Sequence, residues 1–218
     1  MNVGELIEAY RYESKDTNVP PFISDDKALE FANQAENEAC RRSGLLRDSK
    51  SSVCFAQVSE NEAMVEISPK IIDIVRVKTS LSPYPLSFAQ TDAMDSYMPG
   101  WEDHSGIPTA YITDYHTGVI RLYPTPASDC DISMTVTRIP LSPMEDDEDC
   151  PEIREDTHPA LVKWMLYRAY SSDDSDLFNP KQAEKSLREF EIEFGTKKSI
   201  RNERWASERN MMSAPPIA

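Results

Sequence analysis

The sequence is poor in the residues from which catalytic and ligand-binding motifs are usually built. Its 218 residues include six glycines, four cysteines and three histidines. It contains no glycine-rich phosphate loop, no nucleophile elbow and no Cys–His catalytic signature. The cysteines form no C-x-x-C pair, so we expect reduced, buried thiols rather than disulfides or a zinc site. The cysteines are Cys40, Cys54, Cys130 and Cys150.

Long apolar runs are missing as well, and positive charge is scarce. No segment approaches the roughly 20 apolar residues that span a bilayer, and residues 1–5 lack the basic start of a signal peptide. The net charge of −15 argues against a protein that wraps duplex DNA, because phosphate binding needs clustered Lys and Arg. It still allows a surface that DNA passes without adhering to it, because like charges repel. The hydrophobic fraction of 39% is enough to form a core.

Helices are expected at both ends of the chain. Apolar residues at helical spacing predict a helix over 2–12, and a second is expected over 25–43 with Ser24 as its N-cap and Gly44 at its end. Two more are expected near the C-terminal end. One begins after a Thr157 cap and is apolar on most sides, and the other begins at Asn179-Pro180 and ends near Gly195.

Between these helices the sequence turns to β-branched and aromatic runs bounded by Gly, Pro and Asp. Tyr115–Gly118 is short enough to form a hairpin turn. Residues 81–88 carry two prolines and are expected to be an edge strand or loop, and 91–97 a short helical turn capped by Thr91. The predicted strands are 53–58, 63–67, 71–78, 109–114, 118–123 and 132–139.

The predicted fold class is therefore α+β: a helical frame of N- and C-terminal helices with an inserted antiparallel β module of about six strands. The segments are 1–48 (N-terminal helices), 49–143 (inserted β domain), 144–195 (C-terminal helices) and 196–218 (a basic tail). The acidic run within 144–156 is expected to be solvated or to act as a linker. It could also bind calcium through 145–149, but it lacks the glycine and final glutamate of an EF-hand loop.

The tail differs from the rest of this acidic chain. Its basic residues outnumber Glu203 and Glu208, and it also holds tryptophan and methionine. Either it is a disordered end, or it is a docking arm that orders on a partner, since Trp, Arg and Met are favoured in interface cores. The residues assigned to such an arm are Lys197, Lys198, Arg201, Arg204, Trp205, Arg209, Met211 and Met212.

Two other functions were weighed. A metal-dependent hydrolase would use His104, His116 and Asp114 as ligands, but no H-E-x-x-H spacing sets their geometry, and surface turn residues are the simpler interpretation. A carbohydrate- or receptor-binding module would present Trp101, Tyr111 and Tyr115 as an aromatic platform, but core packing explains these aromatics more simply.

One ordered set of residues is more informative than any single motif. It runs from a tryptophan through a G-x-P and a G-x-I-x-L-x-P-x-P pattern to an acidic Pro-Glu-Ile, a helix and two phenylalanines. The set is Trp101, Gly106, Pro108, Tyr111, Asp114, Gly118, Ile120, Leu122, Pro124, Pro126, Met134, Val136, Pro140, Pro151, Glu152, Ile153, His158, Leu161, Val162, Trp164, Phe190 and Phe194. This order resembles the head–tail connector (adaptor) proteins of tailed bacteriophages, especially short-tailed ones. The resemblance covers about residues 3–195, and the tail from Thr196 does not match.

The resemblance implies a structural virion protein rather than an enzyme. Such adaptors form a ring, commonly a dodecamer of about twelve copies, by head-to-tail contacts beneath the portal. The ring extends the DNA channel and seats the tail. The expected partners are the portal ring, tail or nozzle proteins and further copies of the chain, with DNA passing through unrecognised and no membrane or cofactor involved. The expected location is the virion neck, after synthesis in the host cytoplasm. A loop of the β insert, with Trp101, His104, Tyr115 and His116, is a second candidate contact with the tail or a neighbouring copy.

Overall fold

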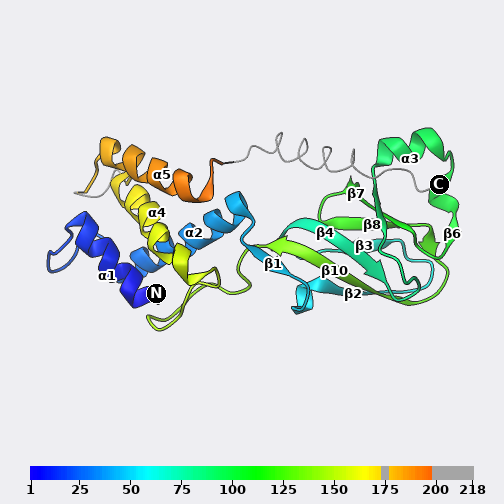
Figure 1. The fold of residues 1–218 in the computed structure, drawn as a ribbon, viewed down its shortest axis with the longest axis horizontal. Helices are drawn as coiled ribbons and strands as arrows, with labels where there is room; N and C mark the ends of the chain where they lie inside the picture. The colour runs from blue at the N-terminus through cyan, green and yellow to red at the C-terminus, as the bar shows by residue number, and fades with distance from the viewer. Residues whose placement is uncertain (173–176, 198–218) are drawn as a thin grey trace. The chain divides into compact units, whose positions relative to one another are not determined.

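The computed structural model describes residues 1–172 and 177–197 (Figure 1). These residues form five α-helices and ten strands in three sheets, so the predicted α+β class is confirmed. Contacts divide them into two compact units. The helical unit comprises Met1–Leu46 and the described residues from Ile139 onward, and the β unit comprises Arg47–Arg138.

The two N-terminal helices begin where side chains can cap them. Helix α1 (Val3–Ser14) starts at a capping box in which Asn2 and Glu5 bond each other's backbone N–H groups. Helix α2 (Asp25–Ser43) has the predicted bounds. The Ser24 side chain accepts the N–H of Lys27, and Gly44 ends the helix in the left-handed region at φ 63°.

The C-terminal helices α4 (His158–Tyr170) and α5 (Pro180–Phe194) begin differently. Asn179 caps α5 as predicted, since its side chain accepts the N–H of Gln182. Thr157 occupies the N-cap position of α4 as predicted, but its side chain makes no capping hydrogen bond. Thr157 belongs to a short 3-10 turn, Glu155–Thr157, and its hydroxyl donates to the Arg154 carbonyl instead of accepting from the helix.

Helix α4 lies at the centre of the helical unit and packs against α1, α2 and α5. Its aliphatic residues from Leu161 to Ala169 are buried and its aromatic residues are half-buried, in line with its nearly all-round hydrophobic sequence. The face of α2 in this core is built from alanines, which allow neighbouring elements to approach closely. The fully buried alanines are Ala28, Ala32, Ala35 and Ala39.

The β unit contains two four-stranded sheets. In the first, β10 (Cys130–Arg138) pairs with β4 (Ile71–Thr79), β2 (Phe55–Val58) and β1 (Leu46–Asp48). The second has the order β3 (Met64–Glu66), β8 (Val119–Tyr123), β7 (Ala110–His116) and β5 (Ser87–Ala89). A third, two-stranded sheet joins β6 (Ser105–Gly106) to β9 (Thr125–Pro126).

Two details of the predicted β module are wrong. The described residues hold ten strands rather than about six, and the pairs β5–β7 and β6–β9 are parallel. The additional strands have only two or three residues, too few for an alternating pattern, so only tertiary pairing defines them. Helix α3 (Thr91–Tyr97) is present, but Thr91 is its first residue rather than its cap. The backbone N–H and the hydroxyl of Thr91 both donate to the Asp114 carboxylate.

The core of the β unit lies between the inner faces of its two larger sheets. Alternate residues of β10 point inward, and Ile132 and Val136 are fully buried together with Ile120 and Leu122 of the opposite sheet. Three of the four cysteines are buried thiols as predicted. Cys150 is exposed, so the prediction is wrong there, because the acidic loop that carries it lies at the surface.

Candidate partner-binding surfaces

A cluster around Trp101 organises one end of the β unit. The indole ring is 2% exposed, and its Nε1–H donates to Asp95 Oδ1 at 2.8 Å. Tyr115 and Tyr123 both contact it edge to face, with ring centroids 6.0 Å away. The cluster therefore fixes α3, the 3-10 turn at Trp101 and the β7–β8 hairpin relative to one another.

The Arg121 guanidinium completes this cluster. It lies 4.8 Å from the Trp101 ring centroid and 4.6 Å from that of Tyr115, and its Nη2 donates to the Glu102 carbonyl at 3.2 Å. Such contacts each contribute about 0.5–2 kcal/mol, the larger value where the cation is desolvated. The Tyr115 hydroxyl donates to Glu102 Oε1 at 2.7 Å, and this hydrogen bond is the main reason that the pKa of Tyr115 is raised.

The predicted contact loop is only partly at the surface. Trp101 is buried, whereas Tyr115 is 37% exposed and His104 and His116 are exposed. His104 Nδ1 lies 3.1 Å from the Tyr123 hydroxyl, so His104 belongs to the Trp101 cluster. His116 lies in the predicted β7–β8 hairpin and pairs with Val119. The side chains of this loop that can contact a partner are therefore those of His104, Tyr115 and His116, whereas the buried Trp101 packs beneath Tyr115.

The metal-site hypothesis fails on geometry. Within residues 1–172 and 177–197, no group of three His, Cys, Asp or Glu side chains is arranged to hold an ion. His116 Nδ1 contacts the Thr117 carbonyl at 3.0 Å, and the Asp114 carboxylate accepts hydrogen bonds from Thr91. The side chains of His104, His116 and Asp114 have separate hydrogen-bond partners and form no shared site in the described part of the chain.

The aromatic-platform hypothesis fails in the same way. Trp101 is buried, and Tyr111 is 6% exposed with its ring against Phe88 at a centroid distance of 5.5 Å. Burial raises the pKa of the Tyr111 hydroxyl, with a further contribution from Asp73. Of the three aromatics, only Tyr115 presents part of its ring to solvent.

The acidic run is held by backbone contacts rather than arranged around a cation. The Asp149 carboxylate accepts the N–H groups of Glu145 and Asp146, and these hydrogen bonds lower the pKa of Asp149. The carbonyls of Asp147 and Asp149 accept the N–H groups of Gly4 and Val3 in the first turn of α1. The run therefore covers the start of α1, and the calcium hypothesis finds no ligand set in the described part of the chain.

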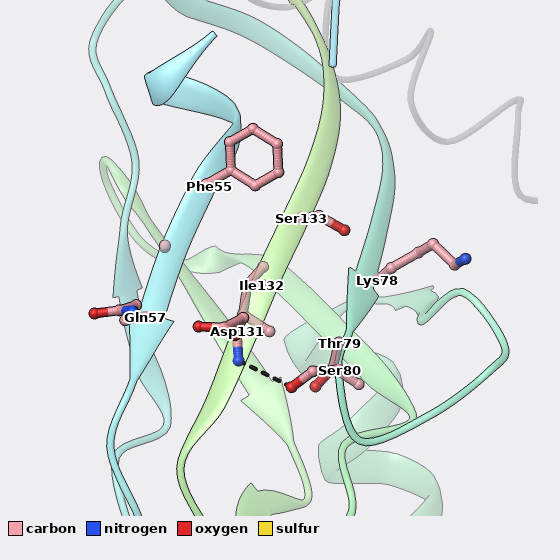
Figure 2. A pocket seen from close by; sticks show the side chains of 9 residues that line it. Phe55, Gln57, Lys78, Thr79, Ser80, Asp131, Ile132 and Ser133 are labelled. Carbon is pink, nitrogen blue, oxygen red and sulfur yellow. Dashed lines mark hydrogen bonds between the residues drawn. The ribbon is translucent and has the colours of Figure 1, made fainter. Parts of the chain in front are cut away.

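A hollow of about 620 Å³ lies on the outer face of the first sheet, formed by β2, β10 and β4 (Figure 2). Phe55 of β2 and Lys78 of β4 both lie opposite Ser133 of β10 in the sheet register. The sequence analysis did not identify this outer-face groove. The sequence pattern that could have indicated it is in β2, where Phe55 lies three residues before the buried Val58 and therefore points to the opposite face of the sheet. The groove is lined by Phe55, Ala56, Gln57, Lys78, Thr79, Ser80, Asp131, Ile132 and Ser133.

The loop between α1 and α2 is a second surface that sequence analysis missed. Val19 is 98% exposed and Phe22 is 43% exposed, and the neighbouring Tyr12 at the end of α1 is 86% exposed. The sequence signal was the presence of apolar residues beside Pro20-Pro21, between the two predicted N-terminal helices. Isolated exposed apolar residues are ordinary, but three so close in the chain mark a candidate contact.

The predicted docking tail lies almost entirely outside the described residues. Lys197 is described and exposed. Lys198, Arg201, Arg204, Trp205, Arg209, Met211 and Met212 are not described. The structure does define where the tail begins, because the end of α5 is held against the end of α2. Ser43 Oγ donates to the Phe194 carbonyl at 2.7 Å, and Arg42 Nη1 donates to the Gly195 carbonyl at 3.2 Å.

Comparison with known proteins supports the resemblance seen in the sequence. None of the curated proteins matches the chain. None of the described helices has the length and apolar character needed to cross a membrane. The model of one protein family, described as SU10 adaptor protein, matches residues 1–214, nearly the whole chain. The chain therefore belongs to the SU10 adaptor protein family, a family of bacteriophage head–tail adaptors.

Proposed function

We propose that this chain forms a ring beneath the portal at the neck of the virion, where it extends the DNA channel and seats the tail. The observation that carries the proposal is the family match over residues 1–214. The family is structural rather than enzymatic. Its head–tail adaptor role implies portal and tail proteins as partners and the neck as location.

Two properties of the chain support this role. The net charge of −15 suits a channel lining that DNA passes without adhering to it. The ring, proposed as a dodecamer, requires head-to-tail contacts between copies, so each copy must carry two different contact surfaces. The helical and β units of one chain offer separate surfaces for this purpose.

We assign different partners to the segments predicted from the sequence. The basic tail, 196–218, docks on the portal, because its Arg, Trp and Met side chains are those favoured in interface cores. The chain just before this tail is held by Arg42 and Ser43, which donate to the carbonyls of Gly195 and Phe194. The exposed side chains around Tyr115 in the β insert, 49–143, contact the tail or a neighbouring copy. The helices of 1–48 and 144–195 form the body of the subunit.

Mass photometry of the purified chain, alone and mixed with the portal ring of the same virus, tests the proposal. We expect the portal ring to gain the mass of several subunits, and the gain gives the number of copies. A portal ring whose mass does not change would contradict the adaptor ring.

Deletion of residues 196–218 tests the docking arm separately. We expect this variant to unfold in urea as cooperatively as the full chain and to lose portal binding. Deletion of 213–218 alone is the matched control, because it keeps every basic and aromatic residue of the tail and should bind normally. Full binding by the longer deletion would show that the portal contact lies elsewhere.

A further inference from the structure

The apolar side chains of the α1–α2 loop are displayed on a rigid support. Asp16 is 1% exposed and accepts the N–H groups of Phe22 at 3.0 Å and Ile23 at 3.2 Å. Arg11 joins the same network through Asp16 and the Ile23 carbonyl, which it contacts at 3.1 Å. A loop already held in one conformation loses little entropy on binding, so this bracing prepares it for a contact.

The exposed residues of this loop include apolar and acidic side chains, together with Lys15 at the end of α1. Val19 and Phe22 supply apolar surface, and Asp25 and Asp26 follow at the start of α2. Asp25 pairs with Arg11, whereas Asp26 is exposed and has no ion pair within the described chain. A partner for this loop should therefore offer an apolar hollow with a cation beside it.

The outer-face groove of the β unit has these properties. Phe55 is 54% exposed at one side of the hollow, and Lys78 stands on the opposite side, across Ser133 (Figure 2). Arg76 lies two residues before Lys78 on the same strand and is exposed. Neither cation has an ion pair among the residues that the structure describes. The groove also contains one acid, Asp131, whose backbone N–H donates to Ser80 Oγ at 3.1 Å.

We propose that the α1–α2 loop of one copy docks in the outer-face groove of a second copy, with Val19 and Phe22 against Phe55 and Asp26 beside Lys78. The two surfaces are complementary in both respects, since each joins an apolar centre to charge of the opposite sign. The loop and the groove are different surfaces of the same chain, so the contact is head-to-tail. Each time a copy is added, the growing assembly still has one unoccupied loop and one unoccupied groove. This inference rests on the ring proposed above and names its subunit contact.

Two variants separate the halves of the contact. The groove variant carries Phe55→Ser and Lys78→Glu, and the loop variant carries Val19→Ser and Asp26→Lys. Val19, Asp26 and Phe55 are exposed and Lys78 is half-buried, and none of the four belongs to the Arg11–Asp16 network, so both variants should keep the fold, which circular dichroism checks. The matched controls are Lys50→Glu and Glu193→Lys, which make the same charge changes at exposed positions outside both surfaces.

Sedimentation velocity of the full-length chain, without portal and over a range of concentrations, gives the readout. We expect the wild type and both controls to form assemblies larger than two chains, and each variant alone to associate at least tenfold more weakly. An equimolar mixture of the two variants should form a complex with the mass of two chains and stop there. In that mixture, only the intact loop of one variant and the intact groove of the other can meet.

A wild type that stays monomeric would overturn the inference, and so would variants that associate as the wild type does or a mixture that forms no two-chain complex. Variants that self-associate normally but no longer bind the portal would assign these surfaces to the portal instead. Failure here is distinguishable from failure of the proposed function, because the portal mass gain is measured separately.

Discussion

Asp48 and Arg138 form an ion pair at the two points where the chain enters and leaves the β unit, with Arg138 Nε 2.6 Å from Asp48 Oδ2. Their side chains are 11% and 8% exposed. Burial opposes the charge of Asp48, but hydrogen bonds from Lys50, Ser51 and Arg138 outweigh it and hold the pKa of Asp48 well below its usual range. The ion pair therefore holds together the first and last residues of the β unit.

Replacing Asp48 with Asn should destabilise the β unit by about 3–5 kcal/mol, because it removes the negative charge from one partner of a largely buried ion pair. Urea unfolding followed by circular dichroism measures the change. The control is Asp156→Asn, which removes an exposed pair with Arg154 and should cost less than about 1 kcal/mol. Equal effects of the two substitutions would show that the Asp48–Arg138 pair contributes no more than a surface pair.

The buried carboxylate of Glu36 should make stability depend on pH in the opposite sense to an ordinary salt bridge. Glu36 is 2% exposed and accepts the N–H groups of Glu152 and Ile153. Its pKa is raised, chiefly because burial disfavours the charged form, although the two hydrogen bonds oppose this effect. The folded state therefore binds a proton at a pH where the unfolded chain, with a pKa of about 4.3, has lost it.

Acidification from neutral pH towards about pH 4 should consequently stabilise the wild type relative to Glu36→Gln, whose side chain does not titrate. Urea unfolding midpoints of both proteins, measured at several pH values, test this difference. An exposed control, Glu193→Gln, should follow the wild type throughout. A constant difference between the wild type and Glu36→Gln would contradict the raised pKa.

Truncation of Trp101 should have a large effect on the β unit. Trp101→Ala removes the ring that Tyr115, Tyr123 and Arg121 contact, and we expect a loss of about 3–5 kcal/mol in unfolding free energy. Tyr97→Ala is the control, because Tyr97 is 85% exposed and its truncation should change stability by less than about 0.5 kcal/mol. A loss below about 1 kcal/mol for Trp101→Ala would mean that the cluster is not a folding element.

Arg42 should control how firmly the end of α5 is held. It pairs with Glu38 and Glu191, donates to the Gly195 carbonyl, and lies over the rings of Trp164 and Phe190. Arg42→Met keeps much of the side-chain length and removes the charge, so we expect a loss of about 3 kcal/mol.

We also expect faster hydrogen exchange at residues 191–195 in this variant, measured by mass spectrometry. Arg188→Met is the control, because the Arg188–Glu184 pair is exposed and contributes less than about 1 kcal/mol. Unchanged exchange at the end of α5 in Arg42→Met would show that the anchor lies in the apolar packing alone.

Local elements were predictable where one short segment holds all the information. Ser24 and Gly44 delimit α2, Asn179 and Pro180 begin α5, and the β7–β8 hairpin turns at Gly118, which has a φ of 76°. In each case a cap or a glycine acts within a few residues of the chain. Thr91 was wrongly predicted as a cap, because its hydroxyl donates to the distant Asp114 and it is the first residue of α3. Thr157 stands at the predicted cap position, but its hydroxyl bonds within the preceding 3-10 turn.

The sequence by itself determined the α+β class, the bounds of α2, the starts of α4 and α5, the longer strands and, through an ordered set of residues, the family. Only the tertiary structure decided the short parallel strands, the separate hydrogen-bond partners of His104, His116 and Asp114, and the groove beside Phe55. Capping and periodicity act over a few neighbouring residues. Burial, strand pairing and ion pairs such as Asp48–Arg138 join positions far apart in the chain, and no local pattern encodes which of them will meet.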